Sequence, residues 1–331
     1  MKFKKCAALL LVSSCLLTGC TTSSAKKVDS KYVVASLEKG NKTKNIFADN
    51  LYKDIIDNSS NNSTVFNAVL QNLVDQKFPV NDDMKEDAAT IIKQIKSAYK
   101  SNYGDNYKDS LNQALTSAGY KNLSEYRQRM IKQIQYANFL LDYIDDHFDD
   151  VFNDYYQQCA PKYVSLIKIS VSDTSSPTDD ETSKLNEVKE LISNTDKSFG
   201  DIAQDYSDDS TSSKKGSLGI VDSKDTSGIA NSYGKDVFNA IKALSEGQVS
   251  DVITGDDGYY FVKVTSTDKK TLKKELKKTD IDSPLLAYDD YLQYVVYNSY
   301  KINYKDKDIK KIVQEVVNKA LEERKTERGE A

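Results

Sequence analysis

The apolar residues between positions 32 and 160 recur every three or four positions, which is the spacing of one face of an α-helix. The longest run alternates by four and three and consists of Met130, Ile134, Ala137, Leu141, Ile144 and Phe148. Asn122 and Glu125 precede it with the spacing of a helix-capping pair. Two shorter stripes lie earlier, at 66–74 and 88–99. We therefore expect the whole segment 32–160 to be helical.

After Pro161 the helical spacing gives way to alternation. Residues 163–171 alternate and are rich in β-branched side chains, which predicts a strand. Two further strands are expected at 249–253 and 259–265. Helices are expected between the strands at 179–193, around Phe199 and at 236–244. This mixture predicts a small α+β module of about 110 residues.

Helical spacing returns beyond the module, at 286–300 and 308–324. Tyrosines recur there mostly at every third position, at Tyr288, Tyr291, Tyr294, Tyr297 and Tyr300. This stripe predicts a C-terminal helix that packs onto the N-terminal helices. We therefore expect an α+β fold, in which residues 32–160 and 269–331 form a helical lobe and residues 161–268 are an inserted module.

The first 19 residues have the features of a secretory signal peptide, with a basic start, a short apolar run and small residues at the end. The sequence Leu17-Thr18-Gly19-Cys20 resembles the bacterial lipobox. It implies cleavage before Cys20 and attachment of a lipid to its sulfur. An ordinary signal peptide with a chance cysteine is the alternative. We expect residues 20–31 to be a polar tether that holds the protein at the extracellular face of the cell membrane.

Composition and charge exclude several classes of function. The chain has 39% hydrophobic and 29% charged residues, which is too much charge for an integral membrane protein. Its formal charge is −4, and it becomes −7 when residues 1–19 leave with three lysines, so no nucleic-acid partner is expected. The 13 glycines form neither GxGxxG nor GxxxxGK[ST], and no cofactor is expected.

His147 is the single histidine, which excludes any catalytic or metal site that needs two of them. Its acidic neighbours in the sequence predict a solvated surface residue. No metal is expected. Cys159 is the one cysteine that follows Cys20, so it has no partner for an intrachain disulfide in the mature chain. We expect it to be a small buried residue rather than a nucleophile.

Five short stretches of the module resemble parvulin-type peptidyl-prolyl isomerase domains in order and spacing. They are SFGDIA at 198–203, YSDD at 206–209, KKGSLG at 214–219, ALSEGQVS at 243–250 and GYYFVKV at 258–264. The whole layout is similar to PrsA-type foldase lipoproteins of Gram-positive cell envelopes, which combine a lipobox, a helical lobe and an inserted parvulin domain. The resemblance implies unfolded or newly secreted polypeptides as partners.

The resemblance also implies where the site lies. Parvulins as a family build its floor from two histidines and a cysteine or aspartate, and the two histidine positions are Leu166 and Tyr260 in this chain. Asp209 matches the aspartate, so Asp209 and Tyr260 are the candidate catalytic residues. The phenylalanine of the proline cup aligns with Val237, or with Phe238 after a one-residue shift. The candidate substrate-binding residues are Leu166, Leu218, Val237 and Phe238. In the alternative interpretation, Asp209 caps a turn, and Leu166 and Tyr260 are plain core residues.

Three functions fit these features. The first is a membrane-anchored foldase or chaperone of secreted proteins whose isomerase activity is reduced by the replacement of both histidines. The second is an active isomerase with a modified site built on Asp209 and Tyr260. The third is a surface lipoprotein that acts as an adhesin or solute-binding component, although the sequence lacks the repeated strand–helix units of two α/β lobes. A homodimer is left open.

Overall fold

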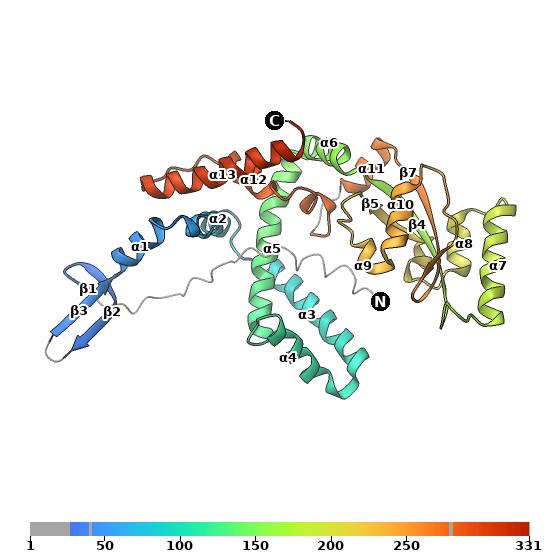
Figure 1. The fold of residues 1–331 in the computed structure, drawn as a ribbon, viewed down its shortest axis with the longest axis horizontal. Helices are drawn as coiled ribbons and strands as arrows, with labels where there is room; N and C mark the ends of the chain where they lie inside the picture. Colours follow the sequence, from blue (N-terminus) through green and yellow to red (C-terminus); the bar gives the residue numbers. More distant parts are fainter. Residues whose placement is uncertain (1–26, 40–41, 278–280, 331) are drawn as a thin grey trace. The chain divides into compact units, whose positions relative to one another are not determined.

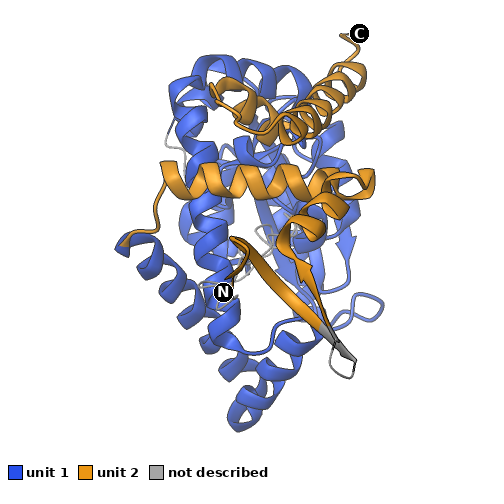
Figure 2. Cartoon of the chain, turned by 90° about the vertical axis from the view of Figure 1, so that its left-hand side faces the viewer, with its two compact units in different colours: residues 1–11, 82–290 blue, residues 12–81, 291–331 orange. Residues whose placement is uncertain are grey.

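The structure is a computed structural model that describes residues 27–39, 42–277 and 281–330 (Figure 1). The predicted signal peptide and Cys20 lie outside the described residues. The chain forms two compact units (Figure 2). In its described part, the first unit is Asp82–Asp290, and the second joins residues 27–81 to residues 291–330. No helix among the described residues is long and apolar enough to cross a membrane. The α+β fold class is confirmed, whereas the domain boundaries at 160 and 269 stay predictions.

The first unit contains a four-stranded antiparallel sheet in the order β5-β4-β7-β6. Its strands are β4 (Lys162–Ser170), β5 (Ser217–Val221), β6 (Ile253–Gly255) and β7 (Gly258–Ser266). The predicted strand at 249–253 is wrong in extent, because Val249 makes only an isolated bridge to Lys263 and β6 begins at Ile253. The helices around the sheet are α7 (Asp179–Asn194), α8 (Phe199–Tyr206), α9 (Ile229–Tyr233) and α10 (Lys235–Ala243).

Alternation along β4 and β7 divides the buried side chains between two cores, because successive residues of a strand point to opposite faces. On one face Leu166 and Tyr260 pack with Val237 and Ile241 of α10. On the other face the core contains Ile167, Ile169 and Phe261 of the strands together with residues of α7 and α8. The sheet is therefore covered by helices on both sides (Figure 1).

Four helices precede the sheet within the first unit: α3 (Asp82–Tyr103), α4 (Tyr107–Ser117), α5 (Leu123–Asp146) and α6 (Phe148–Cys159). The stripe predicted for α5 is buried from Met130 to Ile144. Its predicted cap is confirmed, because the side chain of Asn122 accepts a hydrogen bond from Glu125 N at 2.9 Å. The end of the series is tied to the sheet module, since Tyr155 in α6 donates to Asp222 at 2.9 Å. The short helix α11 (Lys269–Leu276) follows the sheet.

The second unit begins with β1 (Lys27–Val28), β2 (Lys31–Lys39) and β3 (Lys42–Phe47), which form an antiparallel sheet. The prediction that residues 32–160 are helical throughout is therefore wrong at 32–39 and 42–47, which form strands. Asp29 and Ser30, which join β1 to β2, have φ values of 50° and 65°. Two consecutive residues with positive φ give the turn whose twist suits a hairpin, and a helix cannot include them. After the sheet come α1 (Ala48–Ile56) and α2 (Asn62–Lys77).

The C-terminal part of the second unit packs against α2. It contains α12 (Leu292–Ser299) and α13 (Lys307–Glu327). The ring of Phe66 stacks on Tyr294 with centroids 5.0 Å apart and meets Tyr297 edge-on at 5.1 Å. The predicted packing of the tyrosine stripe is therefore confirmed at these two positions. Tyr288 belongs instead to the first unit, where its hydroxyl donates to Asp154.

Gly216 is expected to be essential for the stability of the sheet module. Its φ is +74°, and an added Cβ would lie 2.4 Å from Leu166 O and 2.8 Å from the Cβ of Ala203. We expect Gly216→Ala to lower the free energy of unfolding by about 3 kcal/mol, because the backbone of β4 must move. Denaturant unfolding followed by circular dichroism measures the loss.

Gly219→Ala is the matched control. Gly219 has a similar φ of +80°, but an added Cβ there would meet no atom within 4 Å. Gly219→Ala is expected to lower the free energy of unfolding by only about 1 kcal/mol, because it adds backbone strain alone. Equal losses for the two variants would contradict the role assigned to the close approach at Gly216.

Candidate functional site

The structure brings the predicted substrate-binding residues together on one face of the sheet. Leu166, Val237 and Tyr260 are buried members of a single hydrophobic cluster, and half-buried Leu218 and Phe238 pack against it. Leu166 lies opposite Val262 on the neighbouring strand, and Tyr260 lies opposite Lys168. The predicted positions are therefore neighbours in space. Their role in binding a substrate stays a prediction.

Tyr260 is held tightly where the resemblance places a histidine. The side chain is 2% exposed, and its hydroxyl donates a hydrogen bond to Asp257. Gly255 on β6 leaves room for the ring, because a Cβ there would lie 2.6 Å from the ring carbon Cε2. Lys168 Nζ lies 5.6 Å from the ring centroid and forms an ion pair with Asp257 at 2.5 Å. Tyr260, Asp257 and Lys168 thus form one linked group.

The phenols at this site stay protonated. Burial raises the pKa of Tyr260 above its ordinary value of 10, and the hydrogen bond to Asp257 raises it further. Burial likewise raises the pKa of Tyr233 in α9, with the charge of Asp209 as the second cause. A protonated phenol donates a hydrogen bond but does not accept a proton at neutral pH. The two phenols therefore donate to Asp257 and Asp209, and neither is a general base of the histidine type.

Asp209 is linked to this group through Tyr233. The hydroxyl of Tyr233 donates to Asp209 Oδ1 at 3.4 Å, and the ring of Tyr233 meets that of Tyr260 edge-on at 6.2 Å. The same carboxylate oxygen accepts from Thr211 N at 2.9 Å and caps the short 3-10 helix that begins at Ser210. Asp209 is thus a turn-capping residue and also a neighbour of the site.

The rest of the YSDD motif fixes its turn onto β4. The hydroxyl of Ser207 accepts from Lys168 N at 3.0 Å, and Asp208 N donates to Lys168 O at 2.8 Å. The carboxylate of Asp208 accepts from Ser170 N at 2.9 Å and pairs with Lys184 at 2.6 Å. Because Lys168 is the residue paired with Tyr260, this turn places Asp209 beside the site.

Sequence reasoning missed Tyr233, Asp257 and Lys168. Tyr233 is the one aromatic residue between positions 222 and 236, which was the available signal. Asp257 and Lys168 carried no signal, because a charged residue in a turn or on a strand is ordinary. Their meeting depends on the register of β4 with β7.

Neither His147 nor Cys159 joins this group. His147 is exposed, as predicted, and its Nδ1 lies 2.9 Å from Tyr143 O. Cys159 is buried, as predicted. Among the described residues, no group of three or more His, Cys, Asp or Glu side chains could hold a metal ion.

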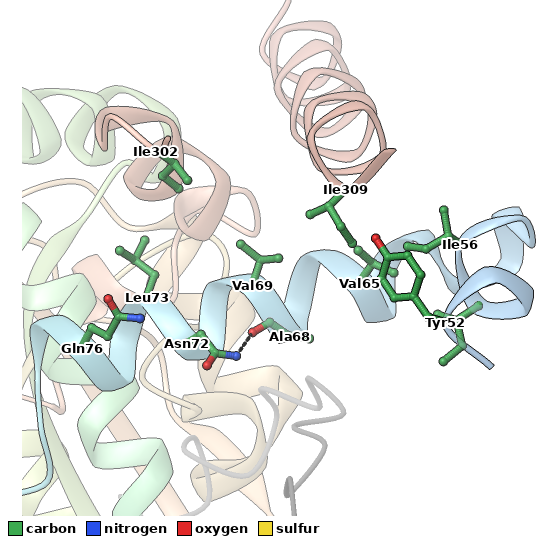
Figure 3. Close-up of a pocket in the computed structure, with 11 residues that line it drawn as sticks. Tyr52, Ile56, Val65, Ala68, Val69, Asn72, Leu73, Gln76, Ile302 and Ile309 are labelled. Carbon is green, nitrogen blue, oxygen red and sulfur yellow. Dashed lines mark hydrogen bonds between the residues drawn. The ribbon is translucent and has the colours of Figure 1, made fainter. Parts of the chain in front are cut away.

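A second candidate site is an open apolar groove of about 460 Å³ within the second unit (Figure 3). Val69 and Leu73 project from α2 on the side that faces Ile302 and Ile309 (Figure 3). The other lining residues are Tyr52, Ile55, Ile56, Val65, Ala68, Asn72 and Gln76. The lining is therefore almost entirely apolar, in a chain with 29% charged residues.

Helix α1 extends the apolar surface at one end of the groove. Leu51, Tyr52 and Ile55 are each about 45% exposed. The hydroxyl of Tyr52 donates to Asp306 at 2.5 Å, and this hydrogen bond raises the pKa of Tyr52 to about 12. Sequence reasoning missed the groove, because helical spacing shows which apolar residues share a face and does not show what covers that face.

Comparisons with known proteins identify the sheet module. Residues 166–266 match the family model Rotamase, which describes a PPIC-type PPIase domain. The "Foldase protein PrsA" of Staphylococcus aureus strain MRSA252 is 32% identical over 141 residues, as is that of Staphylococcus epidermidis strain ATCC 12228. The aligned part is 40% of this chain, and the chain spans 41% of the length of these curated relatives.

Two solved structures are similar over more of the chain but only loosely. PrsA from Streptococcus pneumoniae is 20% identical, with a TM-score of 0.40, and covers 85% of this chain and 99% of its own. PrsA from Bacillus subtilis is 21% identical, with a TM-score of 0.38, and covers 85% and 98%. The predicted resemblance to PrsA-type foldases with a parvulin-type domain is confirmed, and the sheet module is a PPIC-type domain.

The phenol of Tyr260 is expected to stabilise the module. Tyr260→Phe removes the hydrogen bond to Asp257 and should lower the free energy of unfolding by about 1 kcal/mol. Denaturant unfolding measures the loss. Tyr259→Phe is the control, because its hydroxyl is 3.5 Å from its acceptor, Thr174 O, and it should change little. An equal effect of the two substitutions would refute this role for Tyr260.

Proposed function

We propose that this chain is a foldase that binds unfolded polypeptides in the apolar groove of its second unit. We further propose that its PPIC-type module has at most weak isomerase activity. The groove is the observation that carries the proposal, because it presents apolar side chains to solvent without closing over them.

The lining of the groove suits segments of unfolded chain. Val69, Leu73, Ile302 and Ile309 are each half-buried, so a bound apolar side chain would cover surface that water now covers. Burial of apolar surface is favourable by roughly 25 cal/mol per Å² and requires no particular sequence. A groove of this kind therefore binds many clients weakly, as a chaperone must.

The module supports weak rather than full catalysis. Rotation about a peptide bond is opposed by a barrier of about 18–20 kcal/mol, and an isomerase must stabilise the twisted amide. In this chain the two positions that the resemblance assigns to histidines are an apolar Leu166 and a phenol whose hydrogen is already given to Asp257. The module keeps the shape of a peptide-binding fold with fewer free polar groups for the reaction.

An active isomerase with a modified site is the second candidate. The match of residues 166–266 to a PPIC-type domain favours it, as does the link from Asp209 through Tyr233 to Tyr260. In that case Asp209 would be needed for the rate. Isomerisation of X-Pro peptides and binding of unfolded clients are therefore measured on the same protein preparations.

For the location, we propose attachment to the extracellular face of the cell membrane through a lipid on Cys20. The basic start, the apolar run and the lipobox-like end of residues 1–20 support this proposal. Newly secreted polypeptides would meet the groove at that face. A homodimer stays a prediction.

Polar substitutions in the groove are expected to weaken client binding. The variant carrying Val69→Ser and Leu73→Ser should suppress the aggregation of a diluted, denatured client about tenfold less effectively, because it loses apolar contact area. Light scattering measures the suppression, and circular dichroism checks the fold. Tyr103→Ser is the control, because Tyr103 is 52% exposed and does not line the groove.

Three outcomes would contradict the proposal. Full suppression by the groove variant would exclude the groove as the client site. Rapid isomerisation of X-Pro peptides that is lost in Asp209→Ala would establish the second candidate function instead. Tight binding of one small solute, with no effect on unfolded clients, would exclude both.

The lipid anchor is tested separately. Cys20→Ala removes the sulfur that the lipid would occupy, so the protein should leave the membrane fraction and enter the medium. Cell fractionation followed by immunoblotting measures the change, and Cys15→Ala is the matched control within the same segment. Membrane retention of the Cys20→Ala protein would disprove the anchor.

A further inference from the structure

The first unit has a pocket on the face of the sheet opposite to that of Tyr260. It has a volume of about 430 Å³ and is open to solvent. Ser217, Ser165 and Lys263 form its floor as a row across β5, β4 and β7, because Ser165 pairs with both of the others. The same face carries the apolar core further along β4, at Ile167 and Ile169. The row of polar side chains therefore interrupts an otherwise apolar face.

Ser165 is the unusual member of this row. It is 7% exposed, yet its hydroxyl makes no hydrogen bond within the described part of the chain, and it lines the pocket. Its oxygen is not one of the fully buried unpartnered side-chain atoms, so it keeps access to the pocket. The hydroxyl is therefore available to a molecule that enters the pocket.

The charge of the pocket is positive, although the whole chain is acidic. Lys214, Lys215 and Lys263 all line it. Lys215 is paired with Asp201 at 2.7 Å. Lys214 and Lys263 form no ion pair with any residue that the structure describes. Two ammonium groups are thus left to attract an anion.

The first turn of α8 completes the pocket. Phe199 and Gly200 line it. Ser198 caps this N-terminus by accepting from Asp201 N at 3.1 Å, which leaves the N–H groups of Phe199 and Gly200 without an intrahelical acceptor. Gly200 has no side chain to cover these groups, and Lys215 packs over it, since an added Cβ would lie 3.2 Å from Lys215 Cβ. The Asp201 carboxylate in this turn is occupied by Lys215 and by Ser198. The remaining donors point to an anionic ligand.

We propose that this pocket binds a phosphate group. Lys214, Lys263, Ser165 and the first residues of α8 line it from separate elements, and a tetrahedral phosphate presents oxygens in several directions at once. A carboxylate has only two oxygens in one plane and would leave some of these donors unpaired. The pocket is wide and open, so the phosphate can belong to a larger molecule.

Calorimetric titration of the full-length chain tests the proposal. Inorganic phosphate, glycerol 3-phosphate and a bis-glycerol phosphodiester are the probes, and acetate represents the carboxylates. Saturable binding of phosphate is expected, with acetate bound at least about tenfold more weakly. The order among the three phosphates distinguishes free phosphate, a monoester and a diester as the natural source. Binding should also weaken as the salt concentration rises.

Three variants identify the site. The double substitution Lys214→Gln and Lys263→Gln should raise the dissociation constant by about tenfold. The control carries Lys189→Gln and Lys235→Gln, which change the net charge equally outside the pocket, and should stay within about twofold. Ser165→Ala should raise the dissociation constant by about threefold without lowering the melting temperature, because the hydroxyl has no partner to lose.

The results that would overturn the proposal are specific. Absence of saturable phosphate binding would exclude the site, and so would equal binding by the double variant and its control. Acetate bound as tightly as phosphate would identify a carboxylate site, such as one for acidic polypeptide segments. A loss of stability in Ser165→Ala would show that the hydroxyl serves the fold.

Discussion

The antiparallel pairing of β4 with β7 is the constraint on which both faces of the sheet module depend. This register sets Leu166 opposite Val262, Lys168 opposite Tyr260 and Ser165 opposite Lys263. Because neighbouring residues point to opposite faces, a shift by one position would exchange the two sets. Leu166 and Tyr260 would leave their core, and Ser165 and Lys263 would enter it. The close approach of Gly216 to Leu166 and the docking of Ser207 on Lys168 both support this register.

Tyr260, Asp257 and Lys168 form one linked group in the sheet module. Tyr260 fills the space above Gly255, its hydroxyl is bonded to Asp257, and Lys168 balances the charge of Asp257. Such a group is satisfied within itself, so it stabilises the module without requiring a substrate. This is the physical reason for placing client binding in the groove of the second unit rather than at Tyr260.

Stability and binding are separated within the second unit. The aromatic contacts of Phe66 with Tyr294 and Tyr297 join α2 to α12 over more than 220 positions of sequence. They bury one side of α2 and leave Val69 and Leu73 beside the groove. The same helix thus supplies both core residues and the lining of the groove. The packed aromatic rings hold α2 and α12 together on one side of α2. The apolar residues on the groove side of α2 therefore stay open to solvent.

The sequence by itself determined the local features of this protein. Periodicity located α5 and β4, and the spacing of Asn122 and Glu125 correctly predicted a helix cap. The motifs of the module singled out Leu166, Val237 and Tyr260, which lie in one cluster. It failed at 32–39 and 42–47, where two strands of a hairpin stand in place of the expected helix.

Only the tertiary structure decided how distant residues meet. Tyr233 reaches Asp209 from a separate helix, and Lys168 meets Asp257 across two strands. The groove combines α1 and α2 with Ile302 and Ile309. The pocket at Ser165 depends on three strands and the start of α8. Each of these arrangements depends on strand register and helix packing, which no single segment of the sequence contains. The reason is physical: a side chain's type and spacing reflect its own element, whereas its partners are set by how the elements pack.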